Sequence, residues 1–64
     1  MSEFKVSDKV TCDMIQPGQI FIITHICNND EDCPVYTLRE VNDRGQVCQG
    51  LHEALEPDLK LVKR

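Results

Sequence analysis

A chain of 64 residues with a net charge of −4 is near the lower size limit for a domain that folds unaided. At roughly 1.5 kcal/mol of ordering entropy per residue, about 100 kcal/mol must be offset by burial of a small core, which leaves little room for a deep active-site cavity. Seven Lys and Arg against eleven Asp and Glu argue against nonspecific nucleic-acid binding, because that binding depends on basic groups that neutralise phosphates. The composition instead favours solubility or a protein partner.

The sequence contains no apolar segment typical of a signal peptide near Met1 and no apolar run of 18 residues. We therefore expect one domain over residues 1–64, located in the cytoplasm and not inserted in a membrane. Four cysteines in a chain this short would favour disulfides after secretion, but a reducing cytosol favours free thiols.

Residues 4–12 show the first strand pattern. Phe4, Val6, Val10 and Cys12 share one parity, which only Asp8 breaks, and period two predicts a half-buried strand. Residues 13–18 (DMIQPG) contain a Pro-Gly turn. This turn leaves Met14 and Ile15 at exposed loop positions unless they fold inward.

Residues 18–27 (GQIFIITHIC) form the most apolar and β-branched stretch of the chain. The run is too short for a membrane span, and it predicts a central strand over about residues 19–27 that is buried on both faces. Ile22 is expected in the core of this strand. Residues 28–34 (NNDEDCP) predict an acidic loop, since Asn and Asp tolerate turns and Pro34 cannot donate a backbone hydrogen bond.

Residues 35–41 (VYTLREV) predict the next strand, with Tyr36 and Leu38 on one face. The opposite face is expected to hold Val35, Thr37 and Val41.

Residues 42–45 (NDRG) predict a tight hairpin turn in which Gly45 takes a positive φ. Residues 46–52 then return as a strand. Val47 and Leu51 share a face of this strand, and Gly50 relieves crowding or allows a bend. Residues 53–58 (EALEPD) predict a single 3₁₀ turn closed by Pro57. A short closing strand follows, containing Leu59, Leu61 and Val62.

This order of elements resembles that of small SH3-like and KOW-like β-barrel proteins of prokaryotes and phages. FKVSDKV is similar to their V-x-D-x-V first strand, and LHEALEPDLKLV is similar to their 3₁₀ turn and closing strand. The resemblance covers almost the whole chain. It implies an all-β, five-stranded SH3-like barrel with a single 3₁₀ turn before the last strand, and it implies no particular activity.

One group of residues has the ligand types that zinc prefers: His25, Cys27, Cys33, Cys48 and His52. Their spacing contains no C-x2-C, so we expect Cys12 and Cys48 to be small core residues and the histidines to be surface residues of strands. A Cys27–Cys33 disulfide would require an oxidising compartment. We therefore expect no metal and no cofactor.

The sequence also predicts that the chain is not an enzyme. Glu53 and Glu56 have no accompanying base, nucleophile or phosphate-binding glycine loop, and they are expected to solvate the 3₁₀ turn. Three acidic neighbours make Cys33 a poor candidate for a redox nucleophile. With no Trp, one Tyr and two Phe, the chain lacks the aromatic platforms that bind polyproline or single-stranded nucleic acid.

The remaining candidate is a protein-binding surface. Met14 and Ile15 lie in one predicted loop and the acidic run lies in another, and an SH3-like barrel brings these two loops to the same side. We expect this surface to dock a basic region of a larger protein, the alternative being a merely solvated loop. The expected partner-binding residues are Met14, Ile15, Asp30, Glu31 and Asp32.

The predicted function is that of a small non-enzymatic adaptor or modulator of a larger cytoplasmic complex, acting as a monomer or weak homodimer. An alternative is an acidic inhibitor encoded by a phage or mobile element, which blocks a nucleic-acid-handling host enzyme by mimicking nucleic acid. A nucleic-acid-binding KOW-like module is a third reading, which the net charge disfavours.

Overall fold

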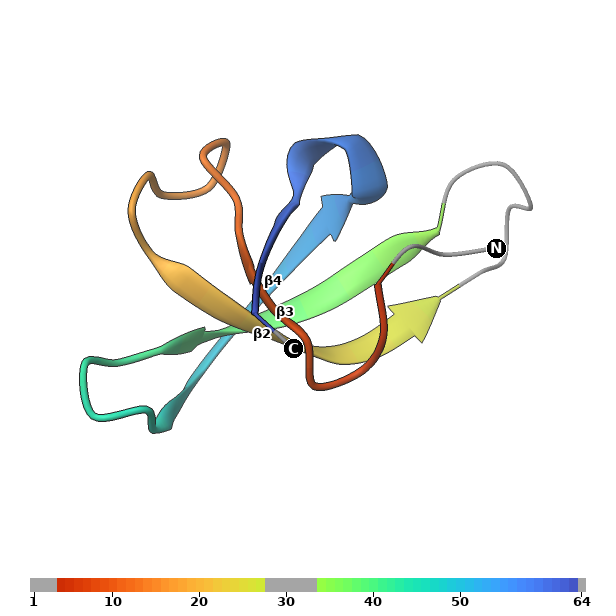
Figure 1. Ribbon diagram of the computed structural model, residues 1–64. Helices are drawn as coiled ribbons and strands as arrows, with labels where there is room; N and C mark the ends of the chain where they lie inside the picture. Colours follow the sequence, from red (N-terminus) through yellow and green to blue (C-terminus); the bar gives the residue numbers. More distant parts are fainter. Residues whose placement is uncertain (1–3, 28–33, 64) are drawn as a thin grey trace.

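The computed structural model describes residues 4–27 and 34–63, which form an all-β domain (Figure 1). Its elements are β1 (Lys9–Thr11), β2 (Ile20–Cys27), β3 (Val35–Val41), β4 (Val47–Leu55), the 3₁₀ turn η1 (Glu56–Asp58) and β5 (Lys60–Lys63). The strands form one antiparallel sheet in the order β4-β3-β2-β1-β5. The predicted all-β class, with five strands and a 3₁₀ turn before the last, is therefore confirmed. The sheet is open, because no pairing between β4 and β5 closes it.

β1 is shorter than the strand predicted over residues 4–12, and the reason is Asp8. Asp8 is buried, its carboxylate accepts a 3.0 Å hydrogen bond from the Lys5 amide, and its own amide donates to the Lys5 carbonyl at 3.0 Å. A short acidic side chain that bonds to nearby backbone competes with strand pairing and favours a turn. The turn places Ser7 at φ 81° and leaves Val6 exposed, so the predicted inward position of Val6 is wrong.

β2 is the central strand, as predicted, but it is buried on one face only. Phe21 and Ile23 are fully buried, whereas Ile22 is half-buried and Ile20 is exposed. The expectation that β2 is covered on both sides, with Ile22 in the core, is therefore wrong. The physical reason is that the sheet packs its core on one side, so successive residues from Ile20 to Ile23 alternate between that core and the opposite surface.

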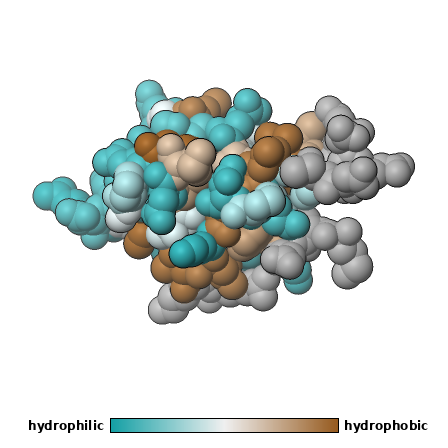
Figure 2. All heavy atoms as spheres, turned by 90° about the horizontal axis from the view of Figure 1, so that it is seen from above, coloured by the Kyte–Doolittle hydropathy of each residue, from teal (hydrophilic) through white to brown (hydrophobic). Residues whose placement is uncertain are grey.

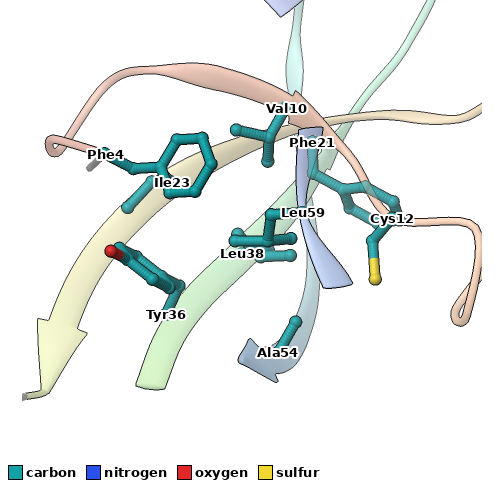
Figure 3. Packing of buried hydrophobic residues seen from close by; sticks show 9 residues of the cluster. All are labelled: Phe4, Val10, Cys12, Phe21, Ile23, Tyr36, Leu38, Ala54 and Leu59. Carbon is teal, nitrogen blue, oxygen red and sulfur yellow. The ribbon is translucent and has the colours of Figure 1, made fainter. Parts of the chain in front are cut away.

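The core gathers buried side chains from the N-terminal segment, the strands and the residue after η1 (Figure 3). Its members are Phe4, Val10, Cys12, Phe21, Ile23, Tyr36, Leu38, Ala54 and Leu59. The ring of Phe4 meets that of Tyr36 edge-to-face, with centroids 5.5 Å apart. The Tyr36 hydroxyl donates a 2.7 Å hydrogen bond to the Glu56 carboxylate, which ties η1 to β3. A buried tyrosine hydroxyl needs such a partner, and a charged acceptor makes the bond stronger.

β3 has the predicted bounds, and the hairpin that follows it has the predicted geometry. The Gly45 amide donates to the Asn42 carbonyl at 2.9 Å, and Gly45 has φ 80°. The Asn42 side-chain oxygen accepts hydrogen bonds from the amides of Arg44 and Gln46, both at 2.9 Å. Asn42 therefore holds the turn through its side chain as well as its backbone.

β4 continues to Leu55, three residues beyond the predicted end, and η1 is correspondingly short. Ala54 pairs opposite Tyr36 and is buried, so antiparallel pairing with β3 extends through residues that the sequence assigned to the 3₁₀ turn. A register shift between β3 and β4 lies beside Gly50. A Cβ at Gly50 would meet no atom closer than 3.8 Å, so crowding does not explain this glycine, and the register shift beside it does not place residue 50 at a positive φ.

Candidate functional site: surfaces for a protein partner

The turn between β1 and β2 contains Met14 and Ile15, and the two side chains differ in their exposure to solvent. The amides of Ile15 and Gln16 both donate to the Cys12 carbonyl at 3.1 Å, and Gly18 takes φ 80°. These bonds turn the chain so that Met14 is 79% exposed while Ile15 is half-buried against the core. Of the two apolar side chains predicted to meet a partner, Met14 lies in solvent, and Ile15 contributes in part to packing.

The acidic half of the predicted surface, Asp30, Glu31 and Asp32, lies outside the described residues. Its position beside Met14 therefore stays a prediction.

The cysteines and histidines are dispersed through the described part of the chain. Cys12 is buried in the core, while Cys27 and Cys48 are half-buried free thiols. No group of three or more His, Cys, Asp or Glu that could hold a metal ion occurs among residues 4–27 and 34–63. Cys33, the other predicted member of the zinc group, lies outside these ranges. The predicted core position of Cys48 is wrong in part, because this side chain remains half-exposed at the β3–β4 register shift.

His52 in β4 takes part in a local contact that the sequence did not indicate. Its Nε2 atom lies 3.2 Å from a carboxylate oxygen of Glu40, and its ring meets Phe21 edge-to-face at a centroid distance of 5.5 Å. The side chains of His52 and Glu40 are 30% and 33% exposed, so the pair sits at the rim of the core. Residues 40 and 52 come together because β3 and β4 pair with Leu38 opposite His52. The pair orients the imidazole over Phe21.

The face of the sheet opposite the core is the surface that the sequence analysis missed. Register places Lys9, Ile22, Arg39 and Leu51 in one row across β1, β2, β3 and β4. Ile20 lies two residues from Ile22 and points to the same side, and Val47 pairs opposite Val41, which lies two residues from Arg39, beyond the register shift in β4. We call the surface formed by Lys9, Ile20, Ile22, Arg39, Val47 and Leu51 the outer face. Ile20, Val47 and Leu51 are exposed, and Ile22 and Arg39 are half-buried.

Arg39 stands between two aliphatic neighbours on the outer face. Ile22 of β2 lies opposite Arg39 on one side, and Leu51 of β4 lies opposite it on the other. Its Nε atom is covered and has no hydrogen-bond partner among the residues that the structure describes. A guanidinium in such partly apolar surroundings binds a carboxylate more strongly than one in bulk water, because the local dielectric is lower. The combination can therefore hold an anionic group next to an aliphatic one.

Figure 2, which shows the molecule from above, has apolar side chains reaching the surface at several places between hydrophilic ones. The signal for the outer face was present in the parity of Ile20 and Ile22 against Phe21 and Ile23. A continuous apolar run nevertheless predicts a strand covered on both sides, which masks this parity.

Comparison with known protein families, curated proteins and solved structures found no match to this chain. Within the described ranges, no helix has the length and apolar character needed to cross a membrane.

Proposed function

We propose that this chain is a small SH3-like domain that acts as a non-enzymatic, protein-binding adaptor or modulator of a larger cytoplasmic complex. The observation that carries the proposal is the number of large apolar side chains at the surface of so small a domain. Among residues 4–27 and 34–63, eight such residues are exposed by about a third or more: Val6, Met14, Ile20, Val47, Leu51, Leu55, Leu61 and Val62. Of these, Ile20 and Leu51 lie on the outer face with half-buried Ile22, and apolar side chains grouped on one exposed face are typical of interaction sites.

Two features of the sheet support the SH3-like part of the proposal. Strands β1 to β4 pair in the order of the chain, every pairing is antiparallel, and the last strand returns to pair with the first. The one-turn η1 immediately precedes that last strand, as the resemblance implies. Closure of the sheet into a barrel belongs to the proposal.

The partner-binding role of Met14, Ile15, Asp30, Glu31 and Asp32 is part of the same proposal. Exposed Met14 supplies apolar surface, and the carboxylates supply long-range attraction that salt weakens.

An affinity pull-down from lysate with mass spectrometry identifies the partner and tests the proposal. Replacing Asp30, Glu31 and Asp32 by Ser is then expected to slow association and reduce its salt dependence, while Met14→Ser mainly speeds dissociation. Both variants must first unfold at the wild-type temperature. Recovery of no specific partner would contradict the adaptor role.

The alternative function is an acidic inhibitor that mimics nucleic acid on a nucleic-acid-handling enzyme. The net charge of −4 favours this alternative, because surface carboxylates can occupy a site built for phosphates. Competition decides between the two functions. DNA that displaces the chain from its purified partner supports the inhibitor, whereas DNA that leaves the complex intact supports the adaptor. A gel shift of DNA by the chain alone at low salt would contradict both.

A further inference from the structure

We propose that the outer face of the sheet binds a partner segment that carries aliphatic side chains next to carboxylates. This inference rests on the proposed protein-binding role and names both the surface and the chemistry of its occupant. The surface differs from the one predicted from the sequence, which was acidic and was expected to meet a basic partner. The outer face contains basic residues in an acidic chain.

The charge distribution of the sheet is the first argument. Lys9 and Arg39 lie in the central row of the outer face, and exposed Lys60 pairs opposite Thr11 at its β5 side. Two carboxylates of the strand region, Asp8 and Glu40, are held at the core side by burial and by the contact with His52. The charge of the outer face is thus opposite to the net charge of −4, and it is complementary to a carboxylate.

One carboxylate of the described strands shares the outer face. Glu53 pairs opposite Thr37, in the row beyond Arg39 and Leu51, and it is exposed. No ion pair joins it to Arg39. The negative charge of Glu53 therefore repels a carboxylate bound at the edge of the outer face, and removing this charge should strengthen the binding of an acidic segment.

The apolar side chains are the second argument. Ile22 and Leu51 flank Arg39, and Ile20 and Val47 extend the aliphatic surface in the next row. Aliphatic surface around an arginine is a composition found at protein–protein contacts, where burial supplies the free energy and the guanidinium supplies geometric specificity. An occupant must therefore bring aliphatic groups as well as an anion.

The same residues disfavour two other occupants. A second copy of the chain docked face to face would bring together two faces that each carry Lys9 and Arg39, and like charges across an interface oppose binding. Nucleic acid would gain phosphate contacts from these residues but would leave Ile20, Ile22 and Leu51 without base stacking, for which aromatic side chains are needed.

The test uses the ¹⁵N-labelled chain and three short, terminally blocked peptides. One peptide alternates Leu and Glu, the second alternates Leu and Lys, and the third alternates Ser and Glu. We expect the Leu–Glu peptide alone to bind, with amide chemical-shift changes centred on Ile22, Arg39 and Leu51 and an affinity that falls at high salt.

Arg39→Gln and Leu51→Ser are each expected to weaken the binding of the Leu–Glu peptide roughly tenfold. Glu53→Gln should strengthen it, and Asp43→Asn, which removes the same charge from the exposed turn between β3 and β4, should leave it unchanged.

Each variant is first compared with the wild type in thermal unfolding, and Arg39→Lys serves as a second variant if Arg39→Gln fails to fold. Equal binding of the Leu–Lys or Ser–Glu peptide, or no binding of the Leu–Glu peptide at millimolar concentration, would overturn the inference. Chemical-shift changes away from the outer face, displacement of the peptide by duplex DNA, or self-association that Leu51→Ser abolishes would also overturn it.

If Arg39→Gln and Leu51→Ser still bind the partner from the pull-down normally, the inference fails while the adaptor function stands. If the pull-down recovers no specific partner, the adaptor function fails whatever the peptides do.

Discussion

At the scale of single residues, Ile22 and Ile23 show how strand geometry assigns different roles to identical side chains. Ile23 is 1% exposed and lies in the core with Phe21 and Leu38. Ile22, its neighbour in β2, points to the outer face and is half-buried beside Arg39. The two residues are chemically the same, so the difference in burial alone should set their contributions to stability.

Ile23→Ala is therefore expected to lower the free energy of unfolding by about 2–5 kcal/mol, because it removes buried methylene groups and leaves a cavity. Ile22→Ala should lower it by less than about 2 kcal/mol, because much of the lost surface is already in contact with water. Urea titrations of both variants measure the two values. A larger loss for Ile22→Ala than for Ile23→Ala would show that the faces of β2 are assigned the wrong way round.

At the scale of elements, the hairpin between β3 and β4 is held by local chemistry. Asn42 accepts hydrogen bonds from Arg44 and Gln46 through its side chain, and Gly45 takes the positive φ that the turn requires. Gly50 in β4 differs from Gly45. A Cβ there meets only ordinary contacts at 3.8 Å, and its φ does not lie in the left-handed region. The backbone conformation of the turn thus favours glycine at position 45, whereas the backbone conformation at position 50 is open to other residues.

This contrast predicts opposite effects for the same substitution. Gly45→Ala should destabilise the domain by about 1–2 kcal/mol, because a side chain disfavours positive φ. Gly50→Ala should be neutral or stabilise it by up to about 1 kcal/mol, because alanine reduces the conformational entropy of the unfolded chain. Thermal unfolding of the two variants measures the difference. Equal destabilisation by both would mean that Gly50 has a role that its open surroundings do not show.

At the scale of the whole molecule, one core on one side of an open sheet organises the domain. Segments distant in sequence meet in this core: Phe4 packs against Tyr36, and Tyr36 bonds to Glu56 in η1. Cys12 belongs to the same core, whereas Cys27 and Cys48 are half-buried in β2 and β4. The thiols of the described residues are thus distributed through the fold and do not converge.

We accordingly expect folding to be independent of metal. Treatment with EDTA should leave the thermal unfolding temperature unchanged, and elemental analysis of the purified chain should find less than stoichiometric zinc. The physical reason is that structural zinc requires four converging ligands, which the described residues do not supply. One tightly held zinc per chain, with unfolding on chelation, would contradict this expectation.

The sequence by itself determined the elements whose signals are local. The alternation of Tyr36 and Leu38 with Val35 and Thr37 was sufficient for β3, and Asn42 with Gly45 was sufficient for the hairpin, because each depends on neighbouring residues. Of the candidate site, Met14 was correctly assigned to an exposed turn.

Only the tertiary structure decided which surfaces are covered. Whether Ile22 is buried depends on whether another layer lies over it, and β4 reaches Leu55 because β3 offers pairing partners that outweigh the local 3₁₀ signal. The placement of Arg39 between Ile22 and Leu51 likewise follows from pairing across three strands. Register joins residues far apart in the chain, and the pattern of one segment indicates which of its residues share a face but not which residues of another strand lie opposite them.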